Sequence, residues 1–183
     1  MRARVLEATV DALAADGFGG LQMESVAAAA GVNKTTLYRR WRTRSALVAD
    51  ALLEVSASEV PIPDTGRLTD DLLALARSVR RAITSRRGRA IVGALAASQD
   101  VPDLRQVARR FWRTRYDANA AIITRAIQRG ELATEPDPRR VVAALAGPIY
   151  FRAFVTRERL DDDFLRTIVH NVVTGLRMEG DRS

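Results

Sequence analysis

The side chains best suited to chemistry lie in one stretch of the sequence, from Met23 to Trp41. Within it, Lys34, Thr35 and Thr36 stand together at the start of a short segment with an apolar face. A threonine can hydrogen-bond a base edge or touch a thymine methyl group, and a lysine can reach guanine or a phosphate. Because such groups at the start of an exposed helix suit the major groove, this segment predicts DNA recognition.

The residues that follow carry groups of the phosphate-binding kind. Tyr38 presents a hydroxyl at the end of a rigid side chain, and four arginines come after it: Arg39, Arg40, Arg42 and Arg44. Contacts of this kind position a protein on DNA without reading the base sequence. The alternative interpretation is that Tyr38 and Trp41 are core aromatics and the arginines a solvated surface. We expect Trp41 to be core and the arginines to serve DNA binding.

Two short helices must position these side chains. The sequence predicts one helix over residues 23–30 and a second over 34–41. A helix-turn-helix needs a small residue where its helices touch and a glycine at the turn, and Ala27 and Gly31 occupy those places. Asn33 is expected to cap the second helix, so that its first turn faces outward. Three apolar residues are expected to fill the shared core: Val26, Val32 and Leu37.

Composition sets the broad class of the protein. The chain has 183 residues, of which 47% are hydrophobic and 28% charged, as in a globular domain. The net charge is +7, carried almost wholly by arginine because Lys34 is the only lysine. This charge favours nucleic acid as a partner before an acidic membrane surface, although arginine richness can equally reflect a GC-biased genome. No apolar run reaches the length of a membrane span and no signal peptide is recognisable, so we expect a cytoplasmic protein without a membrane partner.

The residue types needed for catalysis are scarce. Cysteine is absent and His170 is the only histidine, so disulfides and cysteine metal sites are excluded, and a zinc site or a catalytic triad would depend on one residue. The best enzyme hypothesis is a helical hydrolase or lyase that pairs His170 with Asp117 or Asp103. No phosphate-binding loop, nucleophile elbow or metal-spaced cluster accompanies them. We therefore predict a protein that is not an enzyme, with no catalytic residue, metal or cofactor.

The apolar periodicity predicts an all-α chain of about nine helices. We expect a helix-turn-helix domain over residues 1–48 and a helical ligand-binding and dimerisation domain over residues 49–183, joined by a helix over 44–58. The first helix is expected to end at Asp16-Gly17, and further helices are expected over residues 68–85 and 90–97, with a break at Gly88 between them. A long helix is expected to begin at Asp100-Val-Pro-Asp103 and to end at Gln128. The last two helices are expected to begin at Asp137-Pro138 and at Asp161.

Residues from about Arg4 to Leu53 resemble the N-terminal DNA-binding domain of the TetR family of transcriptional regulators. The resemblance rests on Gly17, Ser25-Val-Ala27, the block Ala30-Gly-Val-Asn-Lys-Thr-Thr-Leu-Tyr38, Trp41 and Arg44-Ser-Ala-Leu47. It implies that four side chains face bases or nearby phosphates: Lys34, Thr35, Thr36 and Arg39. It also implies that Tyr38 and Arg44 hold the DNA backbone. Gln22 stands where the family commonly has Thr or Ser as a helix cap, and Arg44 where it commonly has Lys; we expect each departure to change a phosphate contact.

Beyond Pro61 the resemblance implies five helices, of which the last two form a four-helix bundle with a second copy of the chain. The segments concerned are Arg139–Val155 and Asp161–Arg177. Pro148 is expected to kink the first of them, and small residues beside it permit close approach of helices: Ala143, Ala144, Ala146 and Gly147. The alternative is an ordinary packing face within one chain. We expect a homodimer through these last two helices.

Aromatic residues make up only 5% of the chain, so their placement is informative. Five are candidates to line an apolar pocket for a small-molecule effector: Phe111, Trp112, Tyr116, Tyr150 and Phe154. The alternative is that they are core residues. Four arginines interleave with them, and we expect three of the four to be solvated: Arg109, Arg110, Arg113 and Arg115.

Together these features predict a ligand-responsive repressor. Its homodimer is expected to bind a palindromic operator with recognition helices about 34 to 36 Å apart. An unidentified small molecule in the C-terminal domain is expected to release it, by binding better to a form whose recognition helices are wrongly spaced. The alternative is a non-specific architectural DNA-binding protein. The large C-terminal domain, which DNA binding does not require, favours the sensor.

Overall fold

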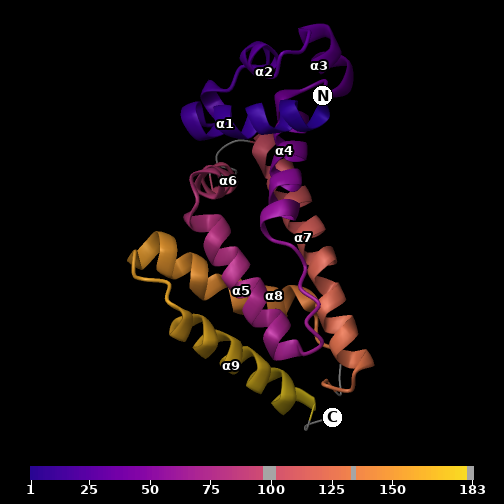
Figure 1. The fold of residues 1–183 in the computed structure, drawn as a ribbon, viewed down its shortest axis with the longest axis vertical. Helices are drawn as coiled ribbons and strands as arrows, with labels where there is room; N and C mark the ends of the chain where they lie inside the picture. The colour runs from indigo at the N-terminus through magenta and orange to yellow at the C-terminus, as the bar shows by residue number, and fades with distance from the viewer. Residues whose placement is uncertain (97–101, 133–134, 181–183) are drawn as a thin grey trace. The chain divides into compact units, whose positions relative to one another are not determined.

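The computed structural model describes residues 1–96, 102–132 and 135–180, and within these ranges the protein is built from helices without a strand (Figure 1). The elements are α1 (Arg2–Gly20), α2 (Met23–Ala29), α3 (Lys34–Arg40), α4 (Arg44–Glu59), α5 (Leu68–Thr84), α6 (Arg86–Ala96), α7 (Pro102–Gln128), α8 (Pro138–Phe151), the π-helical turn η2 (Arg152–Thr156) and α9 (Asp162–Gly180). The predicted all-α class is confirmed. The predicted start of the long helix at Asp100 lies outside the described residues.

The chain packs into two compact units. Unit 1 contains residues 1–58 and 82–113, and unit 2 contains residues 59–81 and 114–183. The N-terminal helices therefore share a unit with α6 and the first half of α7, which are distant from them in the sequence.

Unit 1 has a core of aliphatic side chains drawn from helices along its whole sequence. Leu6 on α1, Leu47 on α4, Ile91 on α6 and Leu104 on α7 all belong to it. In Figure 1, α1 has α2 on one side and α6 on the other, and it packs against both. Each fully buried aliphatic side chain contributes roughly 1.5 to 3 kcal/mol to folding. This core supplies the support on which the helix-turn-helix sits.

Helix ends in unit 1 follow the sequence prediction except around Gly88, and the predicted end at residue 97 lies outside the described residues. The helical backbone of α1 is interrupted at Gly17, where φ is 66°, as expected. The break predicted at Gly88 is wrong, because the chain breaks at Ser85 and Gly88 lies inside α6. A Cβ atom on Gly88 would lie 1.8 Å from the Ala82 carbonyl oxygen. Glycine is therefore needed there for a close backbone approach, which sequence periodicity does not reveal.

The start of α5 in unit 2 is held by two carboxylates. Asp71 is fully buried, and its Oδ1 accepts hydrogen bonds from the Thr65 backbone N–H at 2.6 Å and the Thr65 hydroxyl at 2.8 Å. The Glu131 carboxylate accepts from the Leu68 N–H at 2.9 Å and pairs with the Arg129 guanidinium at 2.7 Å. Because Glu131 follows α7, this contact ties the end of α7 to the first turn of α5.

The first turns of α8 and α9 carry the caps that the sequence predicts. Asp137 accepts a hydrogen bond from the Arg139 N–H at 2.9 Å, with Pro138 in the first turn of α8. Asp161 accepts from the Phe164 N–H at 2.9 Å at the start of α9. Asp162 pairs with Arg77 and, at 3.3 Å, with Arg80. These arginines hold the pKa of the Asp162 carboxyl below its ordinary value, chiefly through the hydrogen bond from Arg77.

Candidate nucleic-acid interface

The helix-turn-helix packs on the small and apolar residues that the sequence singles out. Val26, Ala27 and Leu37 are buried, and Val32 is partly buried against the same core. Gly31 has a φ of 64°, and the chain turns so that the Val32 N–H bonds the Ala27 carbonyl at 2.9 Å. A positive φ is strained for residues with a Cβ, so the turn requires glycine. The predicted helix-turn-helix is therefore formed as expected.

Asn33 caps α3 and frees the first turn of that helix. Its Oδ1 accepts a hydrogen bond from the Thr35 N–H at 2.8 Å, and its backbone is extended, as an N-cap requires. Lys34 and Thr35 are exposed, and Thr36 is partly exposed. The side chains predicted to read bases thus lie together on one exposed helical turn.

Tyr38 stands at the surface with its hydroxyl engaged by α2. The side chain is 39% exposed, and its hydroxyl donates a hydrogen bond to Glu24 Oε1 at 2.9 Å. Glu24 is exposed in the first turn of α2. The bond lowers the pKa of the Glu24 carboxyl and raises the pKa of the Tyr38 phenol from their ordinary values. The sequence singled out Tyr38 but not its partner, because a pair 14 residues apart follows no helical spacing.

Arg44 is bound to the end of α1. Its Nη1 donates to the carbonyl oxygens of Gly19 at 3.2 Å and Leu21 at 3.4 Å, and its guanidinium lies over the Phe18 ring, 4.3 Å from the centroid. A planar guanidinium can stack on a ring in this way, whereas the ammonium of a lysine cannot. Arg44 therefore has a part in the fold that sequence analysis missed, in addition to its predicted phosphate contact.

The remaining candidates surround α3. Gln22 is the N-cap residue of α2 and is exposed, with no hydrogen bond from its side chain to the helix, in agreement with its reading as a weak cap. Arg39, Arg40 and Arg42 are exposed. Trp41 is 3% exposed, and its indole Nε1 donates to Asp50 Oδ2 at 3.0 Å, which confirms that Trp41 is core.

The structure brings the candidate effector-binding aromatics together in two groups. Phe111 belongs to the core of unit 1 and meets Trp112 edge to face, with ring centroids 5.2 Å apart. In unit 2, Tyr150 and Phe154 are stacked with centroids 6.2 Å apart, and Tyr116 is partly buried. Core packing thus accounts for Phe111, whereas the pair in unit 2 keeps an exposed edge because Phe154 is 37% exposed.

Unit 2 contains buried polar groups on α7 that the aromatic pattern did not reveal. Arg115 is buried and donates to the Val60 carbonyl at 2.8 Å, while Arg109, Arg110 and Arg113 are exposed, so the expectation of three solvated arginines among four is confirmed. Burial lowers the pKa of Arg115. Asn119, one turn further, is buried and donates to the Arg115 carbonyl at 2.8 Å. Burial also raises the pKa of Tyr150 to about 12, which keeps this phenol neutral at ordinary pH.

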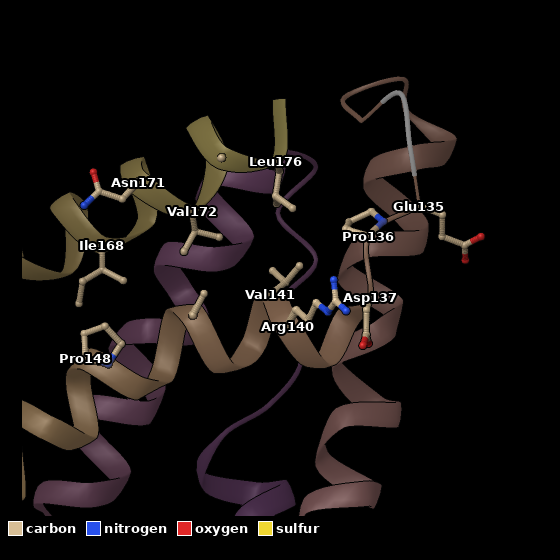
Figure 2. Close-up of a pocket in the computed structure, with 12 residues that line it drawn as sticks. Glu135, Pro136, Asp137, Arg140, Val141, Pro148, Ile168, Asn171, Val172 and Leu176 are labelled. Atoms are coloured by element: carbon tan, nitrogen blue, oxygen red, sulfur yellow. The ribbon is translucent and has the colours of Figure 1, made fainter. Parts of the chain in front are cut away.

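An open groove lies between α8 and α9 in unit 2 (Figure 2), with a volume of about 640 Å³. In Figure 2, Val141 on α8 points toward Val172 and Leu176 on α9. The small residues Ala143, Ala144 and Gly147 are exposed on α8, and Ala146 is partly exposed. Pro148 lies inside α8, which continues into the π-helical turn η2. The groove therefore combines an apolar centre with polar side chains from Glu135, Asp137, Arg140 and Asn171, and it is open in the single chain.

The residues of the enzyme hypothesis are exposed where the structure describes their side chains. His170 and Asp117 are both exposed, and the side chain of Asp103 lies outside the described part of the structure. Among the described residues, no group of three or more histidine or acidic side chains is placed to hold a metal ion. No helix in the described ranges is long and apolar enough to cross a membrane.

An all-helical chain with a glycine-hinged helix pair and an exposed, capped second helix is a helix-turn-helix DNA-binding protein. Residues 5–51 match the bacterial regulatory proteins of the tetR family, and residues 62–172 match the tetracyclin repressor-like C-terminal domain. The chain belongs to the TetR family of transcriptional regulators.

Relatives with similar sequences extend over nearly the whole chain. The HTH-type transcriptional regulator AqdR of Rhodococcus erythropolis is 36% identical over 94% of this chain and 82% of its own. The DNA-binding transcriptional repressor TetR of Mycobacteroides abscessus is 30% identical over 98% of this chain and 95% of its own. The crystal structure of the TetR family regulator SCO0332 superposes with a TM-score of 0.79 at 32% identity, covering 95% of this chain and 97% of that one.

Proposed function

We propose that this TetR family regulator is a homodimeric repressor that binds a palindromic operator and is released by a small molecule bound in its C-terminal part. The observation that carries the proposal is the first turn of α3, where Asn33 caps the helix and leaves Lys34 and Thr35 exposed. A recognition helix presents its N-terminal residues to the major groove in this way.

The division of DNA contacts is the one that the resemblance to the TetR family implies. Lys34, Thr35, Thr36 and Arg39 read or flank bases, and the backbone contacts come from Gln22, Tyr38 and Arg44. A change at Thr36 then alters the preference at one base pair by about 1 to 3 kcal/mol, whereas a change at a phosphate-binding residue weakens binding to all sequences alike.

The second copy of the chain covers the groove between α8 and α9. Support comes from the exposed small residues of α8 and the apolar lining of Val141, Val172 and Leu176. Contiguous apolar surface on one chain marks an interaction site, and a self-complementary face gives a two-fold dimer. Such a dimer presents two recognition helices to successive major grooves, about 34 to 36 Å apart.

The effector binds in the C-terminal part, near the predicted aromatic residues Tyr116, Tyr150 and Phe154. The other two predicted residues, Phe111 and Trp112, precede Tyr116 on α7. Buried Arg115 and the neutral phenol of Tyr150 supply polar groups there. Figure 1 shows that α5 and α7 are continuous helices, and each contributes residues to both units. A ligand that favours one arrangement of these helices shifts the population away from the DNA-binding form, and DNA must weaken ligand binding by the same factor.

Selection from random duplex DNA at two salt concentrations tests this function. We expect enrichment of a palindrome whose half-sites lie about one helical turn apart. Binding that depends steeply on salt without an enriched sequence would instead favour a non-specific architectural protein. We infer that the regulator acts in the cytoplasm, because residues 5–51 match bacterial regulatory proteins and bacterial DNA lies in that compartment.

A further inference from the structure

The hydroxyl of Tyr38 has one proton to donate, and two acceptors compete for it: the Glu24 carboxylate and, in the proposed complex, a DNA phosphate. In the structure the hydroxyl donates to Glu24 Oε1, with 2.9 Å between the two oxygens. An ionised carboxylate and a phosphate diester both act only as hydrogen-bond acceptors under ordinary conditions, so the phenol cannot donate to both at once. A phosphate contact by Tyr38 therefore requires the bond to Glu24 to break.

The exposure and the charge of the pair also favour competition between Glu24 and a phosphate for the Tyr38 hydroxyl. Tyr38 and Glu24 are both exposed, so the bond is not enclosed by the core and its rupture needs no rearrangement of buried side chains. The hydrogen bond from Tyr38 holds the pKa of the Glu24 carboxyl below its ordinary value, which favours the charged carboxylate. A phosphate that reaches the phenol is then brought close to this negative charge, and the two anions repel.

We propose that Glu24 competes with the DNA backbone for the Tyr38 hydroxyl and thereby weakens DNA binding. The carboxylate occupies, within the free protein, the place that a phosphate oxygen takes in the complex. Breaking this bond costs the same on any DNA sequence, so Glu24 lowers the affinity for all duplexes. The inference rests on the phosphate contact of Tyr38 in the proposed function.

Two other roles for Glu24 would change DNA binding in different ways. If Glu24 served to orient the phenol toward DNA, its removal would weaken binding. If Glu24 acted only through its charge, its removal would strengthen binding whether or not the phenol were present. The coupling between the two residues separates these cases.

The experiment measures binding of the full chain to a fluorescently labelled duplex of random sequence, using Glu24→Gln, Glu24→Ala, Tyr38→Phe and the double variant Glu24→Ala with Tyr38→Phe. Asp117→Asn is the control, because it removes one exposed negative charge in unit 2. Circular dichroism checks that each variant is folded. We expect Glu24→Ala to bind about threefold more tightly than Asp117→Asn, with a smaller gain for Glu24→Gln, whose amide oxygen still accepts the bond.

The same series separates a failure of the inference from a failure of the proposed contact. In support, Tyr38→Phe weakens binding and most of the gain from Glu24→Ala disappears in the double variant. A loss of affinity in Glu24→Ala, no change, or a gain that is equal with and without the phenol overturns competition while Tyr38→Phe still reports the phosphate contact. If Tyr38→Phe binds as well as the original chain, the phosphate contact itself is wrong.

Discussion

The surface around α3 and the interior of unit 2 place their polar groups in opposite ways. Lys34 and Thr35 are exposed on a short helix that is defined by a cap two residues away and a glycine turn. Arg115 and Asp71 are buried, and each contacts a residue that is distant in the sequence: Arg115 donates to the Val60 carbonyl, and Asp71 pairs with Arg129. The exposed surface of α3 is specified by neighbouring residues, whereas the interior of unit 2 depends on contacts between distant segments.

The largest effect is expected where the buried carboxylate of Asp71 in unit 2 is removed and its partners lose their acceptor. Asp71→Ala leaves the Thr65 N–H and the Arg129 guanidinium, 3.5 Å from Asp71, without this acceptor. We expect a loss of about 4 kcal/mol in the free energy of unfolding, measured by urea denaturation.

Asp70→Ala is the matched control for that change. Asp70 lies beside Asp71 in the first turn of α5, and its carboxylate is exposed and 3.9 Å from Arg67. Exposed pairs at such distances contribute little, so we expect a change below about 0.5 kcal/mol. Equal losses of unfolding free energy in Asp71→Ala and Asp70→Ala would contradict the view that the interior of unit 2 depends on the contact between Asp71 and Arg129.

The next effect tests whether unit 1 also contains a site that only tertiary contacts specify. In Gly88→Ala the new methyl group meets the Ala82 carbonyl oxygen at 1.8 Å, so the backbone must shift. We expect a loss of about 2 to 3 kcal/mol by thermal or urea unfolding.

Gly93→Ala provides the comparison within the same helix. A Cβ at Gly93 meets nothing within 4 Å, and alanine favours the helix, so this variant is expected to gain roughly 0.5 to 1 kcal/mol. A tolerated Gly88→Ala would show that the close approach at the start of α6 is not a constraint on the fold.

The smallest effect on stability concerns the cap that defines the recognition surface. Asn33→Ala removes the acceptor of the Thr35 N–H, and we expect a loss of about 1 kcal/mol. Gln22→Ala, at a cap position without a side-chain hydrogen bond, should leave the unfolding free energy nearly unchanged. Affinity for duplex DNA should fall in Asn33→Ala, since the first turn of α3 frays. Unchanged affinity would mean that the cap does not organise the DNA-reading turn.

Local signals explain why so much of the N-terminal site was predictable. The cap at Asn33, the turn at Gly31 and the buried Ala27 each act over a few residues, and each is found as expected. The caps at Asp137 and Asp161 are of the same kind. The contacts that were missed join distant positions, such as Tyr38 with Glu24 and Arg44 with the end of α1.

The all-α class, the helix-turn-helix and the family follow from the sequence, because periodicity, caps and turn glycines are properties of neighbouring residues. The folded structure was needed to show that Arg115 is the buried arginine of the four, that Gly88 permits a close approach, and that Glu24 accepts the hydrogen bond of the Tyr38 hydroxyl. Burial and hydrogen bonding between segments depend on how the chain returns on itself, and no local spacing pairs the Tyr38 hydroxyl with its acceptor on α2.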